Sequence, residues 1–324
     1  MEEQKKDDVI LELKDVKVHF KLDEGLLKAV DGVSFTIRKG RTLGIVGESG
    51  CGKSTTGRTI LKLIEPTSGR ILFNGQDITN YSRKKMRPLR QEMQMVFQDP
   101  FSSLDPRQTV SQLISEPIIE HRLLHSKAEI EKRTLELMET VGLAERYINV
   151  YPHELDGGRR QRIGIARALA VKPKLIVCDE PVSALDVSIQ AQILNLLKQL
   201  QKDMGLTYIF ITHDLSVVKY FSDDIAVMYL GQMVEKAPSD DLFRDPMHPY
   251  TKALLSAIPL PIVGKDKTKR QLIRGEITSP VNLPDECRFG KRCDYTADVC
   301  RACTPQLREL APNHFVACAR CGEI

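Results

Sequence analysis

The chain has 324 residues, of which 42% are hydrophobic and 28% charged, so it can build one large core and a smaller appendage. Its 47 basic and 43 acidic side chains leave a net charge of +4, which argues against nucleic acid as a partner. No apolar run approaches the roughly 18 residues of a membrane-spanning helix, and the charged start MEEQKKDDVI is unlike a secretion signal. We therefore expect a protein that is neither exported nor embedded in a membrane by its own sequence.

The N-terminal part of the chain carries the alternating pattern of β-strands. Apolar side chains alternate over residues 9–20 and 33–37, which predicts antiparallel strands, and we expect the polar residues 1–8 to be flexible. Apolar runs predict further strands at residues 42–46, 70–75, 93–97, 175–178, 208–212 and 225–230. Helical periodicity predicts helices at residues 56–64, 126–141, 161–170 and 188–204. The predicted fold is α/β, with a core of mostly parallel sheet, an antiparallel β subdomain and an inserted helical lobe at about residues 99–165.

A glycine-rich loop stands between the predicted strand at 42–46 and the helix at 56–64. Its sequence, GESGCGKST, has the phosphate-loop pattern, in which two glycines flank four residues and precede Lys53 and Ser54. The glycines let backbone N–H groups turn inward around a phosphate, and the helix N-terminus adds positive potential. Lys53 can reach the terminal phosphates, and the Ser54 hydroxyl can bind Mg²⁺. The predicted nucleotide-binding residues are Gly47, Glu48, Ser49, Gly50, Cys51, Gly52, Lys53, Ser54 and Thr55.

Polar side chains follow three of the other predicted strands. Asp179 and Glu180 end one buried strand, where Asp179 can hold Mg²⁺ through water and Glu180 can orient or deprotonate the attacking water. Gln98 can approach Mg²⁺ and this water, and His213 can contact the γ-phosphate. We therefore predict Glu180, His213 and Gln98 as catalytic residues, Asp179 as a nucleotide-site residue, and Ser54 and Gln98 as ligands of Mg²⁺.

A second glycine pair opens the helix at about residue 161. The segment contains Asp156, Gly157, Gly158 and Arg159, and paired glycines at a helix start are again an anion-binding geometry. The first loop already accounts for the phosphates of the nucleotide that this chain would bind. We therefore predict that the second pair acts in trans, on a nucleotide that another subunit holds.

The order of these motifs resembles the nucleotide-binding subunit of an ATP-binding-cassette (ABC) transporter over nearly the whole chain. The resemblance implies that residues 47–54 are the Walker A loop, Gln98 the Q-loop, residues 155–159 the signature, and residues 183–186 the D-loop. It also implies Walker B at residues 178–180, His213 as the switch histidine, and head-to-tail dimers that enclose ATP. The family places an aromatic side chain against adenine; the candidate is Phe20, with His19 as an alternative, and Phe20 is equally compatible with a core position.

One position departs from the family pattern. The family signature reads Leu-Ser-Gly-Gly-Gln, whereas this chain has Asp156 for Ser and Arg159 for Gln. A carboxylate that faces a γ-phosphate adds like charge, which predicts a weaker site, although Arg159 can offset part of it. We expect an asymmetric heterodimer in which the site completed by Asp156 is impaired, unless its side chain turns away.

The C-terminal part resembles oligopeptide and dipeptide importer subunits. The resemblance lies in MHPYT at 247–251, residues 254–259 and RGEITSPV at 274–281. Residues 259–270 shift to Pro, Gly and Lys, which predicts a linker between an ATPase domain at 9–258 and a Cys-rich C-terminal domain at 259–324.

Six of the eight cysteines lie between residues 287 and 321. A cytosolic cluster of this kind is more typical of metal binding than of disulfides. Four cysteines match those that hold a four-iron four-sulfur cluster in the resembling family: Cys287, Cys293, Cys300 and Cys318. Zinc is the alternative metal, free cysteines are the simpler interpretation, and Cys303 and Cys321 leave the ligand set open.

The resemblance implies the ATPase subunit of a dipeptide or oligopeptide importer, peripheral on the cytoplasmic face of the cell membrane. It would bind ATP and Mg²⁺ and work with a second homologous ATPase subunit, as a heterodimer or a homodimer. Two transmembrane permeases, and through them an extracytoplasmic peptide-binding protein, complete the predicted assembly. Two alternatives are an importer of nickel or another small ligand and a soluble ABC ATPase that acts on nucleic acid or ribosomes. The latter often has paired cassettes, coiled arms or basic surfaces, which this sequence lacks.

Overall fold

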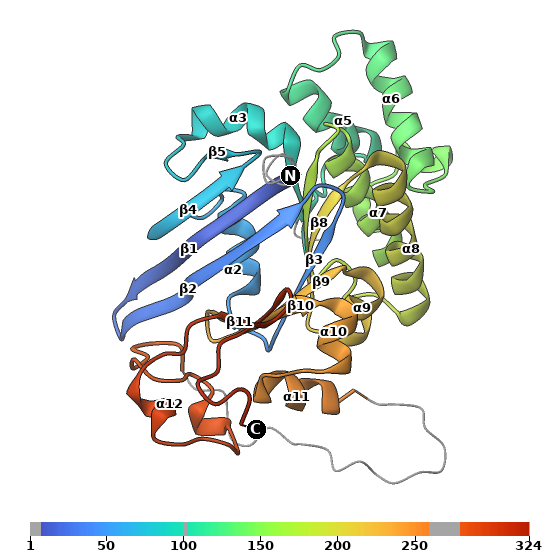
Figure 1. Cartoon of the computed structure of the whole chain (residues 1–324). Coiled ribbons are helices and arrows are strands. Elements are labelled where there is room, and N and C mark those ends of the chain that lie inside the picture. Colours follow the sequence, from blue (N-terminus) through green and yellow to red (C-terminus); the bar gives the residue numbers. More distant parts are fainter. Residues whose placement is uncertain (1–7, 100–102, 259–278, 324) are drawn as a thin grey trace, which may run out of the picture. The chain divides into compact units, whose positions relative to one another are not determined.

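The computed structural model describes residues 8–99, 103–258 and 279–323. The chain divides into two compact units (Figure 1): the first comprises residues 1–37, 42–79 and 212–324, and the second comprises residues 38–41 and 80–211. The predicted linker and most of the RGEITSPV segment lie outside the described residues, as does nearly all of the predicted flexible start.

The first unit contains the predicted antiparallel sheet. Its strands follow the order β2-β1-β4-β5, with bounds β1 (Val9–Leu22), β2 (Gly25–Arg38), β4 (Ser68–Phe73) and β5 (Gln76–Asp77). Strands β1 and β4 run antiparallel, with Leu11 opposite Phe73. Leu11, Leu13 and Phe73 are all buried, because the alternation of the sequence directs apolar side chains to one face of the sheet.

A second sheet in the first unit carries the glycine-rich loop. Strands β3 (Thr42–Val46) and β9 (Asp224–Tyr229) are parallel, and β10 (Gln232–Pro238) runs antiparallel to β9. Every side chain of β3 is buried, as its continuous apolar run predicts for a strand covered on both faces. The longer helices of this unit are α2 (Lys53–Ile60), α9 (Leu215–Phe221), α10 (Ser239–Arg244) and α11 (Pro249–Ser256).

The Cys-rich segment continues the second sheet. Strands β11 (Arg308–Ala311) and β12 (His314–Val316) form an antiparallel pair that adds to β10, which gives the order β11-β12-β10-β9-β3. Between them and α11 lie the short helices η3 (Gly290–Arg292) and α12 (Val299–Ala302). This segment thus belongs to the unit that holds the glycine-rich loop, and a separate Cys-rich domain is not confirmed.

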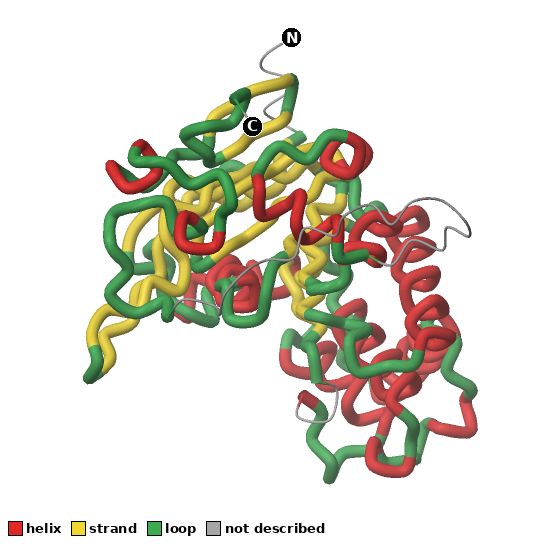
Figure 2. The backbone as a smooth tube through the Cα atoms, turned by 90° about the horizontal axis from the view of Figure 1, so that it is seen from below, coloured by secondary structure: helices red, strands yellow, loops and turns green. Residues whose placement is uncertain are grey.

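The described part of the chain contains both helices and strands (Figure 2), and the second unit combines a parallel sheet with helices. Its strands follow the order β8-β7-β6, with bounds β6 (Met93–Val96), β7 (Leu175–Asp179) and β8 (Thr207–Ile211). Its helices are α3 (Arg83–Glu92), α5 (Val110–Glu120), α6 (Lys127–Thr140), α7 (Gly157–Leu169) and α8 (Val187–Met204), with η1 (Glu145–Tyr147) and η2 (Pro152–Glu154). Helix α7 packs against α5, α6 and α8.

The α/β fold and its mostly parallel strands are confirmed, but some boundaries and elements differ from the prediction. Helix α2 begins at Lys53 rather than at residue 56, because the end of the glycine-rich loop forms its first turn. Strand β10 was missed because Glu235 interrupts its apolar pattern. Glu235 is fully buried, and its carboxylate accepts the N–H groups of Met247 (2.7 Å) and His248 (3.0 Å). Among the described helices, none has the length and apolar character needed to cross a membrane.

Candidate active site

The glycine-rich loop joins β3 to α2 in the first unit, as predicted. Gly47 (φ 151°) and Gly52 (φ 103°) have positive φ angles. A Cβ atom would lie 2.2 Å from the carbonyl oxygen of Met228 at the first position, and 2.1 Å from that of Ala29 at the second. Any other residue at either position would therefore collide with the backbone of a neighbouring segment.

Lys53 places a buried positive charge at this loop. Its side chain begins α2, the residue is 5% exposed, and its ammonium group donates to the carbonyl oxygens of Gly47 (2.8 Å) and Glu48 (2.9 Å). Helix α2 has no acidic residue in its first turn, and no described side chain caps its N-terminus. The positive end of the helix and the ammonium group thus meet at one loop, which suits an anionic phosphate.

The other predicted residues of the loop divide between its tip and the helix. Ser49 and Gly50 are exposed, whereas Ser54 and Thr55 are half-buried in the first turn of α2. Cys51 is buried beneath the loop, and this burial raises the pKa of its thiol. The burial and the raised pKa both disfavour the reactive thiolate form of Cys51.

Phe20, the candidate for adenine stacking, lies near the end of β1. It is 38% exposed, so it is not a core side chain. The neighbouring His19 is instead bound by Asp31, whose carboxylate lies 2.9 Å from Nε2 of the imidazole. The exposed ring of Phe20 is therefore better placed than His19 for stacking on a base.

Three of the predicted catalytic-site residues lie in the second unit. Asp179 is fully buried at the end of β7, and Glu180 follows it with a φ of 46°, an unusual conformation for a residue other than glycine. The Glu180 N–H donates to the carbonyl oxygen of Ile211 at 2.9 Å. The Gln98 amide donates to a carboxylate oxygen of Glu180 at 3.1 Å. The structure thus brings Gln98 and Glu180 together and orients the Glu180 carboxylate.

His213 belongs to the first unit. It is exposed and lies between the end of β8 and the start of α9, which Asp214 caps through the N–H groups of Ser216 (2.8 Å) and Val217 (3.4 Å). The predicted nucleotide and catalytic residues are thus divided between the two units.

The second glycine pair opens α7, which begins at Gly157. A Cβ atom at Gly158 would lie 2.7 Å from Ile189 Cγ2, and one at Gly157 would lie 3.0 Å from Leu185 Cδ2. Leu185 and Ile189 flank the start of α8, whose N-cap is Asp186. The glycines of the signature are therefore also needed for the close packing of α7 against α8 and the segment that precedes it.

Asp156 turns its carboxylate back onto its own helix. One oxygen accepts the backbone N–H of Arg159 at 2.8 Å, and the other forms an ion pair with the Arg159 guanidinium. The guanidinium also lies over the ring of Tyr147, 5.0 Å from its centroid. The carboxylate therefore acts as an N-cap, and an adjacent positive charge balances its negative charge.

The four candidate cluster cysteines influence one another electrostatically in the first unit. Burial, together with the neighbouring thiols of Cys300, Cys318 and Cys293, raises the pKa of Cys287 to about 11, although the Phe289 N–H lowers it. The Cys287 N–H donates to the carbonyl oxygen of Cys300 at 2.8 Å. Cys303, by contrast, is exposed.

A metal site is not formed by these residues as they stand. Within the described ranges, no group of three or more His, Cys, Asp or Glu side chains could hold a metal ion. The effects of Cys300 and Cys318 on the pKa of both Cys287 and Cys293 nevertheless indicate that the four residues lie near one another. Their sulfur donors are of the kind that iron–sulfur clusters and zinc require.

Comparisons with known proteins agree with the motifs. Residues 30–183 match the family model described as ABC transporter, and residues 234–300 match that of the oligopeptide/dipeptide transporter C-terminal region. The chain is 52% identical over 320 residues to the oligopeptide transport ATP-binding protein AppF of Bacillus subtilis (96% of this chain, 97% of AppF). It is 53% identical over 310 residues to OppF of the same species (95% of this chain, 96% of OppF). The chain belongs to the ABC transporter family.

Solved structures of ABC proteins share this fold. The ATP-binding cassette MJ0796, a dimer bound to ADP and phosphate, has a TM-score of 0.66 and 32% identity; the match covers 71% of this chain and 99% of MJ0796. CbiO1 of Clostridium perfringens has a TM-score of 0.65 and 32% identity (74% of this chain, 92% of CbiO1). Members of the ABC family hydrolyse ATP, and this chain is accordingly an ATPase.

Two contacts of the Walker A loop were not foreseen from sequence. The hydroxyl of Tyr250 accepts the Glu48 N–H at 3.0 Å, and the guanidinium of Arg292 binds the Glu48 carboxylate. The family-like segment MHPYT, which contains Tyr250, was the only available signal. This motif identified the segment but gave no sign that Tyr250 contacts Glu48, about two hundred residues away in the sequence.

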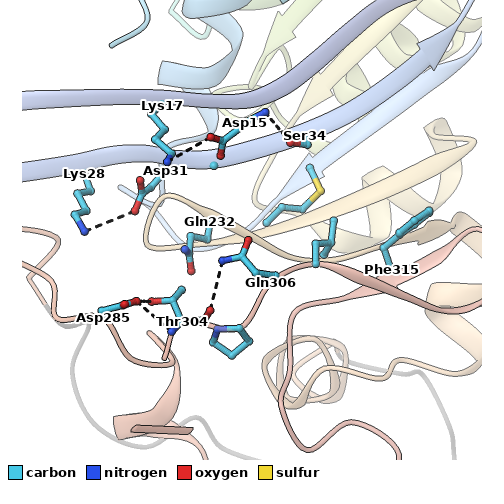
Figure 3. A pocket seen from close by; sticks show the side chains of 14 residues that line it. Asp15, Lys17, Lys28, Asp31, Ser34, Gln232, Asp285, Thr304, Gln306 and Phe315 are labelled. Atoms are coloured by element: carbon cyan, nitrogen blue, oxygen red, sulfur yellow. Dashed lines mark hydrogen bonds and ion pairs between the residues drawn. The ribbon is translucent and has the colours of Figure 1, made fainter. Parts of the chain in front are cut away.

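A polar cavity of about 720 Å³ lies in the first unit, between the antiparallel strands and the C-terminal segment (Figure 3). Several of its charged or polar side chains bind one another: Lys17 lies 3.4 Å from Asp15, Lys28 lies 3.9 Å from Asp31, and the Thr304 hydroxyl donates to Asp285 at 2.6 Å. These contacts pair several of the charged side chains that line the cavity with one another. None of the predicted nucleotide residues lines the cavity.

Proposed function

We propose that this ABC subunit hydrolyses ATP to drive import of dipeptides or oligopeptides at the cytoplasmic face of the cell membrane. The similarity over almost the whole chain carries the proposal, since AppF and OppF, both named for oligopeptide transport, each match 95% of the chain or more. The C-terminal match at residues 234–300 adds to this, because it extends beyond the cassette that other ABC transporters share.

In this proposal the Walker A loop binds the nucleotide. Lys53 and the backbone N–H groups of residues 47–55 bind the phosphates, and the ring of Phe20 stacks on adenine. The Ser54 hydroxyl, the Gln98 amide oxygen and the Asp179 carboxylate are oxygen donors of the type that suits Mg²⁺. Bound Mg²⁺ would supply neutralisation of phosphate charge.

Hydrolysis requires a group that prepares the attacking water. Glu180 is the proposed general base, and the amide of Gln98 holds its carboxylate by the hydrogen bond of 3.1 Å. His213 is the proposed contact to the γ-phosphate. Closure of the ATP-bound dimer and its reopening after hydrolysis would drive the permeases.

The proposed assembly contains a second homologous ATPase subunit and two transmembrane permeases, with an extracytoplasmic peptide-binding protein that delivers cargo. MJ0796, at 32% identity, forms a dimer, which supports dimerisation of this chain. We favour a heterodimer because the signature of this chain differs from the family pattern at Asp156 and Arg159.

The two signature differences compensate for each other in this proposal. Because the Asp156 carboxylate caps α7 and pairs with Arg159, it does not face outward as a single negative charge. We therefore replace the expectation of an impaired second site by the alternative in which the Asp156 side chain turns away from the nucleotide. We propose that Asp156 and Arg159 work as a unit, with Gly157 and Gly158 left to approach the nucleotide of the partner.

We also propose that Cys287, Cys293, Cys300 and Cys318 hold a four-iron four-sulfur cluster. The support is the backbone hydrogen bond from Cys287 to Cys300, the effects of Cys300 and Cys318 on the pKa of Cys287 and Cys293, and the family resemblance. Such a group would supply folding energy to a segment with few large apolar side chains. Protein purified without oxygen should contain about four iron atoms per chain and absorb visible light; zinc in place of iron would select the alternative, and the absence of both would reject a metal.

The transport proposal is tested by purifying the chain with the permeases encoded beside it. We expect Mg-ATP hydrolysis in proteoliposomes to rise when the binding protein is loaded with peptide. Stimulation by nickel or another small ligand instead of peptide would show that the cargo is wrong, while the ATPase assignment would stand.

A further inference from the structure

An ion pair between Arg292 and Glu48, with little solvent exposure, joins the C-terminal segment to the Walker A loop. Arg292 Nη1 lies 2.7 Å from Glu48 Oε2, and Nη2 lies 3.0 Å from Oε1. The Arg292 side chain is 7% exposed and that of Glu48 is 22% exposed. A bidentate pair in such a position is stronger and more directional than an exposed surface pair.

The backbone of Glu48 is held as well. Its N–H donates to the Tyr250 hydroxyl, and the Tyr250 ring packs on Tyr229, with 4.7 Å between the ring centroids. Arg292 also donates to the Tyr229 hydroxyl at 3.2 Å, and the ring of Phe289 meets Tyr229 edge to face at 5.4 Å. Glu48 is therefore fixed at both its backbone and its carboxylate by one packed cluster.

The same segment also reaches the neighbourhood of Phe20. Arg288, which is 8% exposed, binds the carbonyl oxygen of Leu230 and the carboxylate of Asp31. The other oxygen of Asp31 holds His19, the residue before Phe20. Burial raises the pKa of Asp31, but His19, Arg288 and Lys28 together outweigh that effect and lower the pKa, so the carboxylate stays charged.

We propose that residues 287–293 form a clamp that positions the Walker A loop for ATP, with Arg292 as its main positioning residue. The inference rests on the proposed ATP site. Glu48 supplies one of the carbonyl oxygens that hold Lys53, so a fixed Glu48 preorganises the loop and reduces the ordering cost of binding. Without Arg292 the Glu48 carboxylate would also carry an unbalanced negative charge beside the phosphates.

The clamp has a candidate metal ligand at each end. Cys287 precedes Arg288, and Cys293 follows Arg292. A group that binds both thiols would fix both ends of the clamp. Binding of such a group would therefore be coupled to ATP affinity, and the coupling free energy would act equally in both directions.

The test is equilibrium binding of a non-hydrolysable ATP analogue with Mg²⁺ to the full-length chain, measured by calorimetry. Arg292→Met should weaken binding about tenfold or more, because a hydrogen-bonded charged pair is lost. Arg292→Lys keeps the positive charge but cannot form the two parallel hydrogen bonds. Its affinity for the analogue should therefore lie between those of Arg292→Met and the wild type. Arg301→Met, a change at an exposed arginine outside the clamp, should bind like the wild type.

Two further variants distinguish an error in the proposed ATP site from an error in the proposed clamp. Lys53→Ala tests the ATP site itself, since loss of binding there confirms the site whatever Arg292 does. In a Glu48→Leu background, Arg292→Met should have little additional effect, because the pair is already broken. Wild-type affinity in Arg292→Met, or the same affinity loss in both backgrounds, would overturn the clamp, and a thermal melt of each variant checks that it is folded.

The coupling to cysteine is tested in the same assay. Cys293→Ser should weaken analogue binding in the direction of Arg292→Met, while Cys303→Ser, at the exposed cysteine outside the clamp, should leave it unchanged. Wild-type affinity in Cys293→Ser would overturn the coupling.

Discussion

Helices α2 and α7 both start at a glycine-rich segment, but their N-terminal N–H groups have different partners. Helix α2 follows Gly52, no described side chain caps it, and Lys53 adds a positive charge at its start. Helix α7 begins at Gly157, and its N-cap, Asp156, already accepts the Arg159 N–H.

The difference shows what makes a helix start an anion site. The partial positive charge is present at both helices, but at α7 a carboxylate of the same chain already uses part of it. We therefore propose the α2 start as the strong phosphate site, and the α7 start as a weaker contact with a nucleotide that another subunit holds.

The largest effect is expected from a substitution that removes the proposed general base and leaves both helix starts unchanged. Glu180→Gln should lower ATP hydrolysis by about 10² to 10⁴-fold, because an amide cannot accept a proton from water. The measurement needs the assembled complex with the equivalent glutamate of the partner also changed. Analogue affinity at α2 should not fall, and hydrolysis close to the wild-type rate would show that Glu180 is not the base.

A third helix start supports the Walker A loop and should make stability depend on pH. His248 caps α11 by accepting the Tyr250 N–H at 3.1 Å. Burial lowers the pKa of His248 to about 4; Glu235 opposes the shift and Lys252 adds to it. The unfolded chain gains a proton below about pH 6.5, whereas the folded chain does not until about pH 4, so stability falls through this window by about 3 kcal/mol.

Chemical denaturation between pH 7 and pH 4 measures this loss. His248→Asn keeps a capping oxygen but cannot titrate, so its stability should fall less over the same range. An equal fall in the variant would place the titrating group elsewhere.

The pairing of Asp156 with Arg159 predicts how substitutions at the start of α7 change the ATPase rate. Arg159→Gln alone should lower the ATPase rate of the assembled complex about tenfold, because it exposes the Asp156 charge to the nucleotide of the partner. The double change Asp156→Ser with Arg159→Gln restores the family pattern and should recover most of the rate. A double variant as slow as the single one would contradict the pairing.

The smallest effect is expected at the adenine end of the α2 site. Phe20→Ala should weaken analogue binding about threefold to tenfold, in line with the energy of one aromatic stack. Phe20→Tyr keeps the ring and should bind like the wild type. Equal affinity for all three proteins would exclude stacking by this side chain.

The sequence predicted those parts of the site that a local pattern encodes. The strand, glycine loop and helix around Lys53 are contiguous, and so are β7 and its two carboxylates. The contact between Arg292 and Glu48 spans 244 residues and has no local pattern, so only the fold reveals it. Glu235 misled the strand prediction because its charge is satisfied by distant N–H groups and by His314, 2.7 Å away.

The comparison of the two helix starts is tested most directly by analogue binding to the isolated chain. We predict that Lys53→Ala abolishes binding, whereas Asp156→Ala leaves the affinity unchanged because α7 serves only the nucleotide of another subunit. Retained binding in Lys53→Ala, or an equal loss in Asp156→Ala, would contradict the assignment of α2 as this subunit's own ATP site.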